Sequence, residues 1–206
     1  MPIISIALMG FFAFGGVTAP TTASSTEGLQ APVATTTIAM KTSAPIVRLT
    51  GDAAEPLSVM LTAYNAVPEQ TDSNPSVTAS GASSNPEVVM ARSSDLAANL
   101  PYGTIVAVEY TGKDTEGCRY GTVSGLIGYR VIADAMNARM HNKVDVLLDH
   151  TETVEVHGKQ MNPAIALGLC HGVTVRPVAR IKISDMPETQ EELRKLVEGN
   201  SLAINR

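Results

Sequence analysis

Between residues 57 and 183, short runs of hydrophobic and β-branched residues alternate with turn-forming Gly, Pro, Asn and Asp. Runs of this length with such boundaries are typical of β-strands. Six of them can be distinguished: LSVMLTAYNA, SVTASG, PYGTIVAVEYTG, RYGTVSGLIGYRVIAD, NKVDVLLD and GVTVRPVARIKI. The pattern predicts an all-β fold, a small closed barrel, because closure leaves no strand edge exposed.

Two segments carry helical signals instead. NPAIALGL places Pro163 near a first turn and continues with Ala and Leu, which predicts a short helix. In SDMPETQEELRKLVEGN, Asp185 and Glu188 have the spacing of a capping box, and Gly199 stands where a helix ends. Residues 184–206 are therefore expected to form a C-terminal helical tail.

The N-terminal part differs from the rest of the chain. Residues 1–20 are apolar from Ile3 to about Val17 and carry no charge, which indicates a signal peptide or a short membrane anchor. Residues 21–56 are rich in Thr, Ala, Ser and Pro, which is typical of a flexible spacer, with a short strand at IVRLTG. The chain is expected to be exported, into the cell envelope or outside the cell, either free or tethered to the outer face of the cytoplasmic membrane.

Composition narrows the range of partners and of core residues. The 206 residues carry a net charge of -5, which argues against a nucleic-acid-binding face. There is no Trp, and all three Phe lie in the N-terminal segment, so the core is expected to be aliphatic. The four His and two Cys show no metal-ligand spacing, and neither a metal nor a cofactor is predicted. Cys118 and Cys170 form a disulfide in one interpretation and are two reduced thiols in the other.

Four stretches, taken in order, resemble successive blocks of the 3D domain family, which is named for three aspartates. These are LTAYNAVPEQTDSNPSVTASG, LAANLPYGTIV, VIADAMNARMHNKVDVLLD and AIALGLCHGVTVRPV, and they span roughly Ser58 to Val178. The resemblance implies a six-stranded double-psi β-barrel over residues 57–183, related to the barrels of the lytic transglycosylase MltA and of expansin-like and RlpA-like proteins. It further implies peptidoglycan as the partner, and cleavage between N-acetylmuramic acid and N-acetylglucosamine without water, which leaves a 1,6-anhydro end.

Two aspartates match the second and third family aspartates and are the predicted catalytic pair. Asp134 closes the apolar run YRVIAD, and Asp145 lies between Val144 and Val146. Apolar surroundings and a nearby like charge both raise the pKa of a carboxyl group. One aspartate could then remain protonated as the general acid while the other stays ionised and orients it. The alternative is that both simply accept backbone hydrogen bonds at strand ends.

Further residues match family blocks that are expected to line a sugar-binding groove. Hydroxyl groups suit hydrogen bonding to sugars, and a tyrosine ring suits stacking on them. The substrate-binding candidates are Thr62, Tyr64, Asp72, Thr78, Ser80 and Asn99. Strand propensity alone would also explain the Thr and Tyr residues, and Asp72 would equally suit an ordinary turn. Arg139 is either a partner for a peptide-stem carboxylate or a solvated turn residue.

The chain departs from the family pattern at the first aspartate. Lytic members are expected to carry an acid shortly before a Pro-x-Gly-Thr turn, and AANLPYGT offers Asn99 there. An amide does not titrate, so a three-carboxylate arrangement is lost. Two functions stay open: a lytic transglycosylase, and an inactive expansin-like module that binds cell-wall glycan. A structural module of a surface assembly is a third class, suggested by the C-terminal helix.

Overall fold

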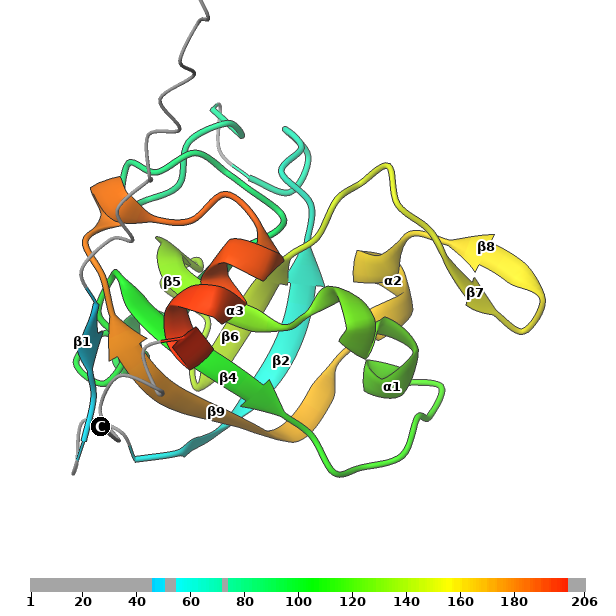
Figure 1. Cartoon of the computed structure of the whole chain (residues 1–206). Helices are drawn as coiled ribbons and strands as arrows, with labels where there is room; N and C mark the ends of the chain where they lie inside the picture. Colours follow the sequence, from blue (N-terminus) through cyan, green and yellow to red (C-terminus); the bar gives the residue numbers. More distant parts are fainter. Residues whose placement is uncertain (1–45, 51–54, 72–73, 200–206) are drawn as a thin grey trace, which may run out of the picture. The chain divides into compact units, whose positions relative to one another are not determined.

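The computed structural model describes residues 46–50, 55–71 and 74–199 (Figure 1). Six strands form a closed barrel, in the order β2–β6–β3–β5–β4–β9, and β9 pairs again with β2. Their bounds are β2 (Leu57–Tyr64), β3 (Val89–Arg92), β4 (Thr104–Glu109), β5 (Tyr129–Ala135), β6 (Lys143–Leu147) and β9 (Cys170–Arg180). The prediction of an all-β fold with a closed six-stranded barrel is confirmed.

The strand order has an internal symmetry. The pairs β2–β6 and β3–β5 are parallel, whereas the other four pairs of the barrel are antiparallel. Exchanging the first three strands (β2, β3, β4) for the last three (β5, β6, β9) leaves both the order and the pair directions unchanged. A barrel made of two such halves is compatible with the double-psi topology.

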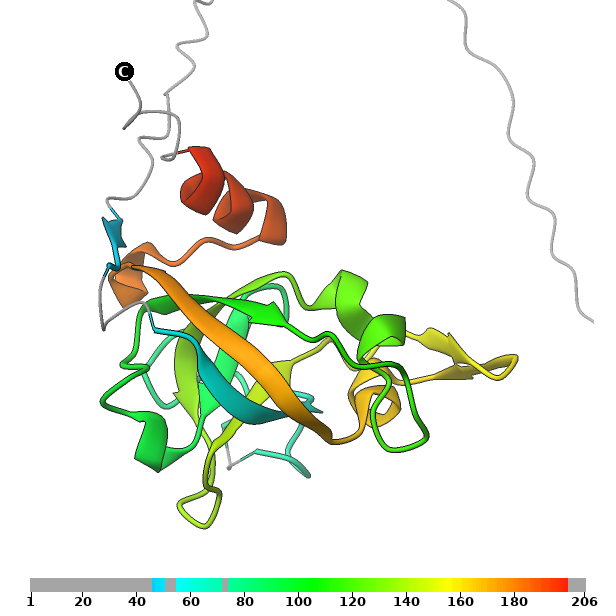
Figure 2. The same ribbon diagram turned by 90° about the horizontal axis from the view of Figure 1, so that it is seen from below.

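Short elements surround the barrel. They are β1 (Val47–Arg48), which pairs with β9, the hairpin of β7 (Val154–Val156) and β8 (Lys159–Met161), α1 (Tyr120–Val123), α2 (Pro163–Leu167), the 3-10 turns η2 (Ser94–Leu96), η3 (Ser124–Leu126) and η4 (Ile183–Asp185), and α3 (Gln190–Gly199). The hairpin projects away from the barrel in both views (Figures 1 and 2). Among the helices of the described residues, none has the length and apolarity needed to cross a membrane.

One of the six predicted strands does not form, and another is shorter than predicted. SVTASG forms turns and a single bridge, between Val77 and Ser83, and the sixth strand is β3, with the sequence VMAR. β3 pairs on both sides and is buried along its whole length, so its sequence lacks the polar alternation that marks a strand. RYGTVSGLIGYRVIAD begins as α1 and η3 and becomes a strand only from Tyr129.

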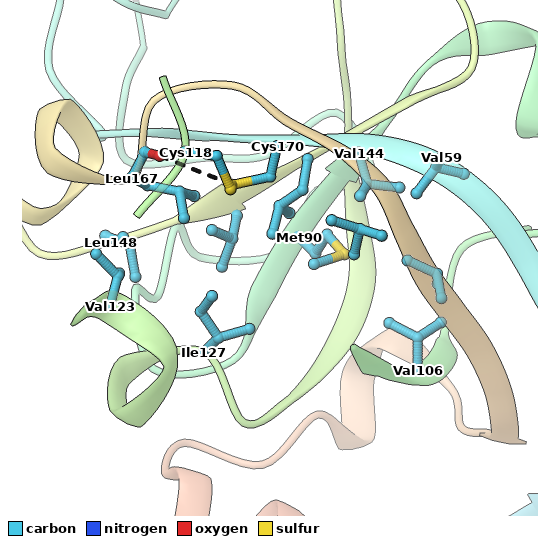
Figure 3. Close-up of a cluster of buried hydrophobic side chains, with 14 of the residues drawn as sticks. Val59, Met90, Val106, Cys118, Val123, Ile127, Val144, Leu148, Leu167 and Cys170 are labelled. Atoms are coloured by element: carbon cyan, nitrogen blue, oxygen red, sulfur yellow. Dashed lines mark hydrogen bonds between the residues drawn. A yellow bond between two sulfur atoms is a disulfide. The ribbon is translucent and has the colours of Figure 1, made fainter. Parts of the chain in front are cut away.

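Alternation along the strands divides the buried residues into two clusters. Met90, Ile132 and Val144 contribute to the first, together with Val123 and Ile127 of the α1–η3 segment (Figure 3). The second lies on the opposite strand faces and includes Tyr64 of β2, Ala91 of β3 and Leu147 of β6. Aliphatic side chains make up most of both clusters, in line with the chain's shortage of aromatic residues.

A disulfide joins Cys118, before α1, to Cys170, the first residue of β9 (Figure 3). Both cysteines are buried in the first cluster. Backbone pairing between Cys118 and Gly168 holds the same two segments together. Of the two interpretations of this cysteine pair, the structure has the bonded one.

The C-terminal helix is part of the domain. Leu193, Leu196 and Val197 of α3 are buried in the second cluster, and the Gln190 amide donates to the Tyr129 carbonyl at 2.7 Å. The predicted capping box was wrong, because Asp185 ends η4 and the chain is extended at Met186. The helix starts instead after Thr189, whose hydroxyl accepts from the Glu192 N–H at 3.2 Å.

A fully buried arginine ties several of these segments together. The Arg130 guanidinium donates to the carbonyl oxygens of Leu126, Ile127, Pro86, Val89 and Leu147. Backbone carbonyls in this number replace the water that a buried cation loses. Arg130 therefore fastens the ends of β3 and β6 to the loop before β5.

Candidate active site

The two predicted catalytic aspartates lie in one row across four neighbouring strands. Thr62 of β2 pairs with Asp145 of β6, Asp145 pairs with Ala91 of β3, and Ala91 pairs with Asp134 of β5. With strands about 4.8 Å apart, the two aspartate Cα atoms are separated by roughly 10 Å. The side chain between them is only a methyl group. The fold thus places the two carboxyl groups side by side over Ala91.

An irregularity in β5 sets the direction of Asp134. Met90 pairs with Ile132, but the next residue of β3, Ala91, pairs with Asp134, so β5 has one extra residue at Ala133. A bulge of this kind changes which strand face the following side chains occupy. Asp134 therefore shares a face with Ala91 and Asp145.

Asp145 has the surroundings of a general acid. It lies between the fully buried Val144 and Val146, and its Oδ1 accepts a hydrogen bond from the Thr62 hydroxyl at 2.8 Å. Burial, aided by the charge of Asp134, raises the pKa of Asp145 to about 6, against the opposing effects of Thr62 and Lys143. A substantial fraction of Asp145 is therefore protonated near pH 6.

The carboxylate of Asp134 accepts three hydrogen bonds. Its Oδ2 accepts from the Tyr64 hydroxyl at 2.7 Å, and its Oδ1 accepts from the backbone N–H groups of Ala79 at 2.8 Å and Ala135 at 2.9 Å. Burial first, and then Asp134, raise the pKa of Tyr64 far above its usual value, so Tyr64 remains a phenol that donates. Three donors suit an ionised carboxylate. The two aspartates therefore differ in environment, as an acid and its charged neighbour would.

The other candidates fall into different environments. Thr62 donates to Asp145, and Tyr64 is 9% exposed, which leaves little of its ring to stack on a sugar. The hydroxyls of Thr78 and Ser80 lie 3.1 Å apart, and the Ser80 N–H donates to the Ala133 carbonyl at 3.2 Å. The structure therefore places Thr62, Tyr64, Thr78 and Ser80 beside the acid pair of Asp134 and Asp145. Thr78 and Ser80 lie in a turn and not on a strand.

The loop after β3 adds no third carboxylate to this cluster. Asn99 is exposed, and its side chain forms no hydrogen bond with the described residues. Asp95, a carboxylate in the same loop, accepts from the Asn142 N–H at 2.9 Å, and this hydrogen bond ties the loop to the β5–β6 connection. Asp72 lies outside the described residues. Arg139 is exposed, and its Nε lies 3.3 Å from the Asn137 side-chain oxygen, within the same turn.

Two groups near the acid pair were missed by reasoning from the sequence. The Ala79 N–H could not be found there, because a backbone donor leaves no residue signature. Lys143 could have been found, because it precedes Asp145 by two positions on a predicted strand and so shares its face. The positive charge of Lys143 lowers the pKa of Asp145.

Neither aspartate lines any of four surface cavities of about 240 to about 570 Å³ that the described residues form. The largest lies beside α3 and η3 and includes Tyr120, Tyr129 and Arg194. Among the described residues no group of three His, Cys, Asp or Glu could hold a metal ion.

Comparison with known proteins adds no identification, because no family model matches the chain and no curated protein sequence matches it.

The hydrogen bond from Thr62 provides a direct test of the Asp145 environment. Thr62→Val removes a donor that lowers the pKa of Asp145, so we expect that pKa to rise above 6. It can be measured by following the carboxyl carbon of Asp145 by NMR during a pH titration. Thr174→Val, a partly buried strand position away from the acid pair, is the matched control. An unchanged titration in Thr62→Val would refute this assignment of the hydrogen bond.

Proposed function

We propose that the protein is an exported member of the 3D domain family that acts on peptidoglycan as a lytic transglycosylase. The observation that carries this proposal is the pair of unlike aspartates in one strand row. Asp145 is partly buried and has a raised pKa, whereas Asp134 is held by three donors. The closed barrel and the four sequence blocks in family order support the same conclusion.

In the proposed reaction Asp145 acts twice. Its carboxyl proton passes to the glycosidic oxygen as the bond to C1 of the muramoyl unit breaks, so that the leaving sugar departs as an alcohol. The Asp145 carboxylate then takes the proton of the muramoyl 6-hydroxyl, whose oxygen bonds to C1 and closes the 1,6-anhydro ring. No water is consumed, and Asp145 ends protonated as it began.

Asp134 has an electrostatic part in this scheme. Positive charge develops at C1 as the glycosidic bond breaks, and a fixed negative charge nearby stabilises it. Tyr64 and the Ala79 and Ala135 amides hold the Asp134 carboxylate in place, so little reorganisation is needed as the charge develops.

The location is part of the proposal. A buried disulfide is typical of proteins that fold in an oxidising compartment, and Cys118–Cys170 is consistent with export. A signal peptide or anchor at residues 1–20 and a spacer over most of residues 21–56 would lie in parts of the chain outside the described residues. The spacer would allow a tethered domain to reach the glycan strands.

The second candidate function is a catalytically inactive module that binds cell-wall glycan, as expansin-like proteins do. The observation that favours it is Asn99, an exposed amide where lytic members are expected to have an acid. Incubation of the purified full chain with peptidoglycan sacculi separates the two functions. A lytic transglycosylase releases soluble muropeptides from the sacculi. Protein that pellets with the sacculi and releases nothing would contradict the catalytic proposal and support the binding module.

A further inference from the structure

Lys143 stands on the same strand face as the proposed general acid. β6 begins at Lys143, and alternation brings residues 143 and 145 to one side, with Cα atoms about 6.6 Å apart. Lys143 pairs with Met60 of β2, two positions along the strand from the pair of Thr62 and Asp145. Its backbone is fixed by Ser93, whose N–H donates to the Lys143 carbonyl at 2.9 Å and whose hydroxyl accepts from the Lys143 N–H at 3.1 Å. The backbone of Lys143 is thus fixed next to the acid pair.

This cation has no carboxylate partner of its own within the described residues. Its Nζ lies 4.0 Å from the Met140 sulfur, and it takes part in no salt bridge there. The nearby carboxyl group is Asp145, which serves the proposed chemistry only when it is protonated and uncharged. Asp134 is already held by three other donors. The ammonium group of Lys143 therefore remains available to an external anion.

The connection between the two aspartate strands adds further basic groups. Residues 136–142 link β5 to β6, and both Arg139 and His141 are exposed in it. Asp95, in the loop after β3, interacts electrostatically with His141 and also accepts from the Asn142 N–H. The edge at Lys143 thus combines a partly buried cation with exposed basic groups, next to a site proposed to bind a glycan.

We propose that Lys143 binds a carboxylate on the muramoyl unit of the substrate, so that the preferred substrate is a glycan with an anionic substituent beside the cleaved bond. This inference rests on the proposed function for the identity of the glycan. In peptidoglycan the carboxylate has two sources: the lactyl group of a muramoyl unit without a peptide, or the peptide stem. Both present the same anion to the ammonium group.

Binding at Lys143 would also affect the acid. The groups that act on Asp145 are Thr62, Asp134 and Lys143, and Asp145 in turn acts on Tyr64. Lys143 favours the ionised form of Asp145. A substrate carboxylate paired with Lys143 offsets that effect, so Asp145 keeps its proton when an anionic substrate is bound. Recognition of the substituent and protonation of the acid are coupled in this way.

The test measures binding separately from cleavage. The full chain carrying Asp145→Asn is titrated calorimetrically with three soluble ligands: glycan strands with peptide stems, strands whose stems an amidase has removed, and a chitooligosaccharide without carboxylates. Adding Lys143→Met should weaken binding of a carboxylate-bearing strand about tenfold, because a charge-assisted contact is lost. Lys143→Arg should retain most of the affinity, and the chitooligosaccharide should bind equally to all three proteins.

The ligands also distinguish the two sources of the carboxylate. A loss confined to strands with stems assigns the contact to the peptide. A loss confined to strands without stems assigns it to the lactyl carboxylate, which is free only when no peptide is attached, and a loss on both shows that Lys143 binds either anion. Equal affinities for every ligand with and without the Lys143→Met substitution, or no binding of any strand, would overturn the proposal. Tight, Lys143-dependent binding without release of muropeptides by the unsubstituted chain would refute the proposed function and leave this inference standing.

A pH profile excludes a merely structural role for Lys143. With Asp145 intact, Lys143→Met removes a charge that lowers the pKa of Asp145. The alkaline limb of kcat/KM for muropeptide release should then move to higher pH, while Lys143→Arg leaves it in place. A variant that was only less well folded would lose activity without moving that limb.

Discussion

Asp145→Asn is expected to lower the rate of muropeptide release by about 10²- to 10⁴-fold, and at the same time to make the protein more stable at pH 7. The rate falls because an amide has no acidic proton to donate to the glycosidic oxygen. The gain follows from burial, which raises the pKa of Asp145 to about 6 in the folded protein. A group with a raised folded-state pKa contributes stability below its unfolded pKa and loses it as the pH rises through the folded value. An amide side chain does not ionise, so the Asp145→Asn protein avoids that loss of stability.

The stability gain should be about 1 to 3 kcal/mol at pH 7 and should vanish below about pH 4. Thermal unfolding at both pH values measures it, alongside the rate of muropeptide release. Asp185→Asn is the matched control, because Asp185 lies in η4 and accepts a hydrogen bond from Ser184 outside the acid pair. An Asp145→Asn protein that retains its cleavage rate would remove Asp145 from the chemistry. One that is less stable at pH 7 would contradict the account of its burial.

Replacing both cysteines by serine is expected to cost about 4 kcal/mol of unfolding free energy. The Cys118–Cys170 bond spans 52 positions, and closing a loop of that length restricts the unfolded chain to this extent. The melting temperature should fall by roughly 10–15 °C. Both sulfurs lie among buried apolar residues, so two hydroxyl groups at these positions would add to the loss.

Thermal unfolding of the double serine variant and of the unsubstituted chain, each with and without reductant, measures this effect. Reductant should lower the melting temperature of the unsubstituted chain toward that of the variant and should leave the variant unchanged. If the two proteins melt within about 2 °C of one another in the absence of reductant, the bond does not contribute as the loop length predicts.

The barrel could be predicted from the sequence because five of its strands carry clear runs of apolar residues with turn residues at their ends. β3 escaped prediction because its four residues are all buried, and burial on both faces removes the alternation that would mark it. SVTASG took its place in the prediction because Val and Thr favour strands. Its Gly81, with a φ of 85°, instead belongs to a turn that lies against β5.

Asp134 and Asp145 were chosen as a pair from the family blocks, whereas their geometry could not be predicted. Asp134 and Asp145 are eleven positions apart, and what aligns them is β3, a strand from elsewhere in the chain, together with a bulge at Ala133. Alternation did predict that Thr62 and Tyr64 share a face. Which carboxylate each of them would contact depends on the order β2–β6–β3–β5, and no local pattern contains that order.

Whether Asp145 cleaves glycan strands without water is tested most directly by the masses of the products. The purified full chain is incubated with peptidoglycan sacculi in water enriched in ¹⁸O, and the soluble muropeptides are analysed by mass spectrometry. We predict 1,6-anhydro ends, lighter than reducing ends by one water and free of ¹⁸O, and no such products from the Asp145→Asn chain. Products with reducing ends that carry ¹⁸O would show hydrolysis and contradict the proposed reaction.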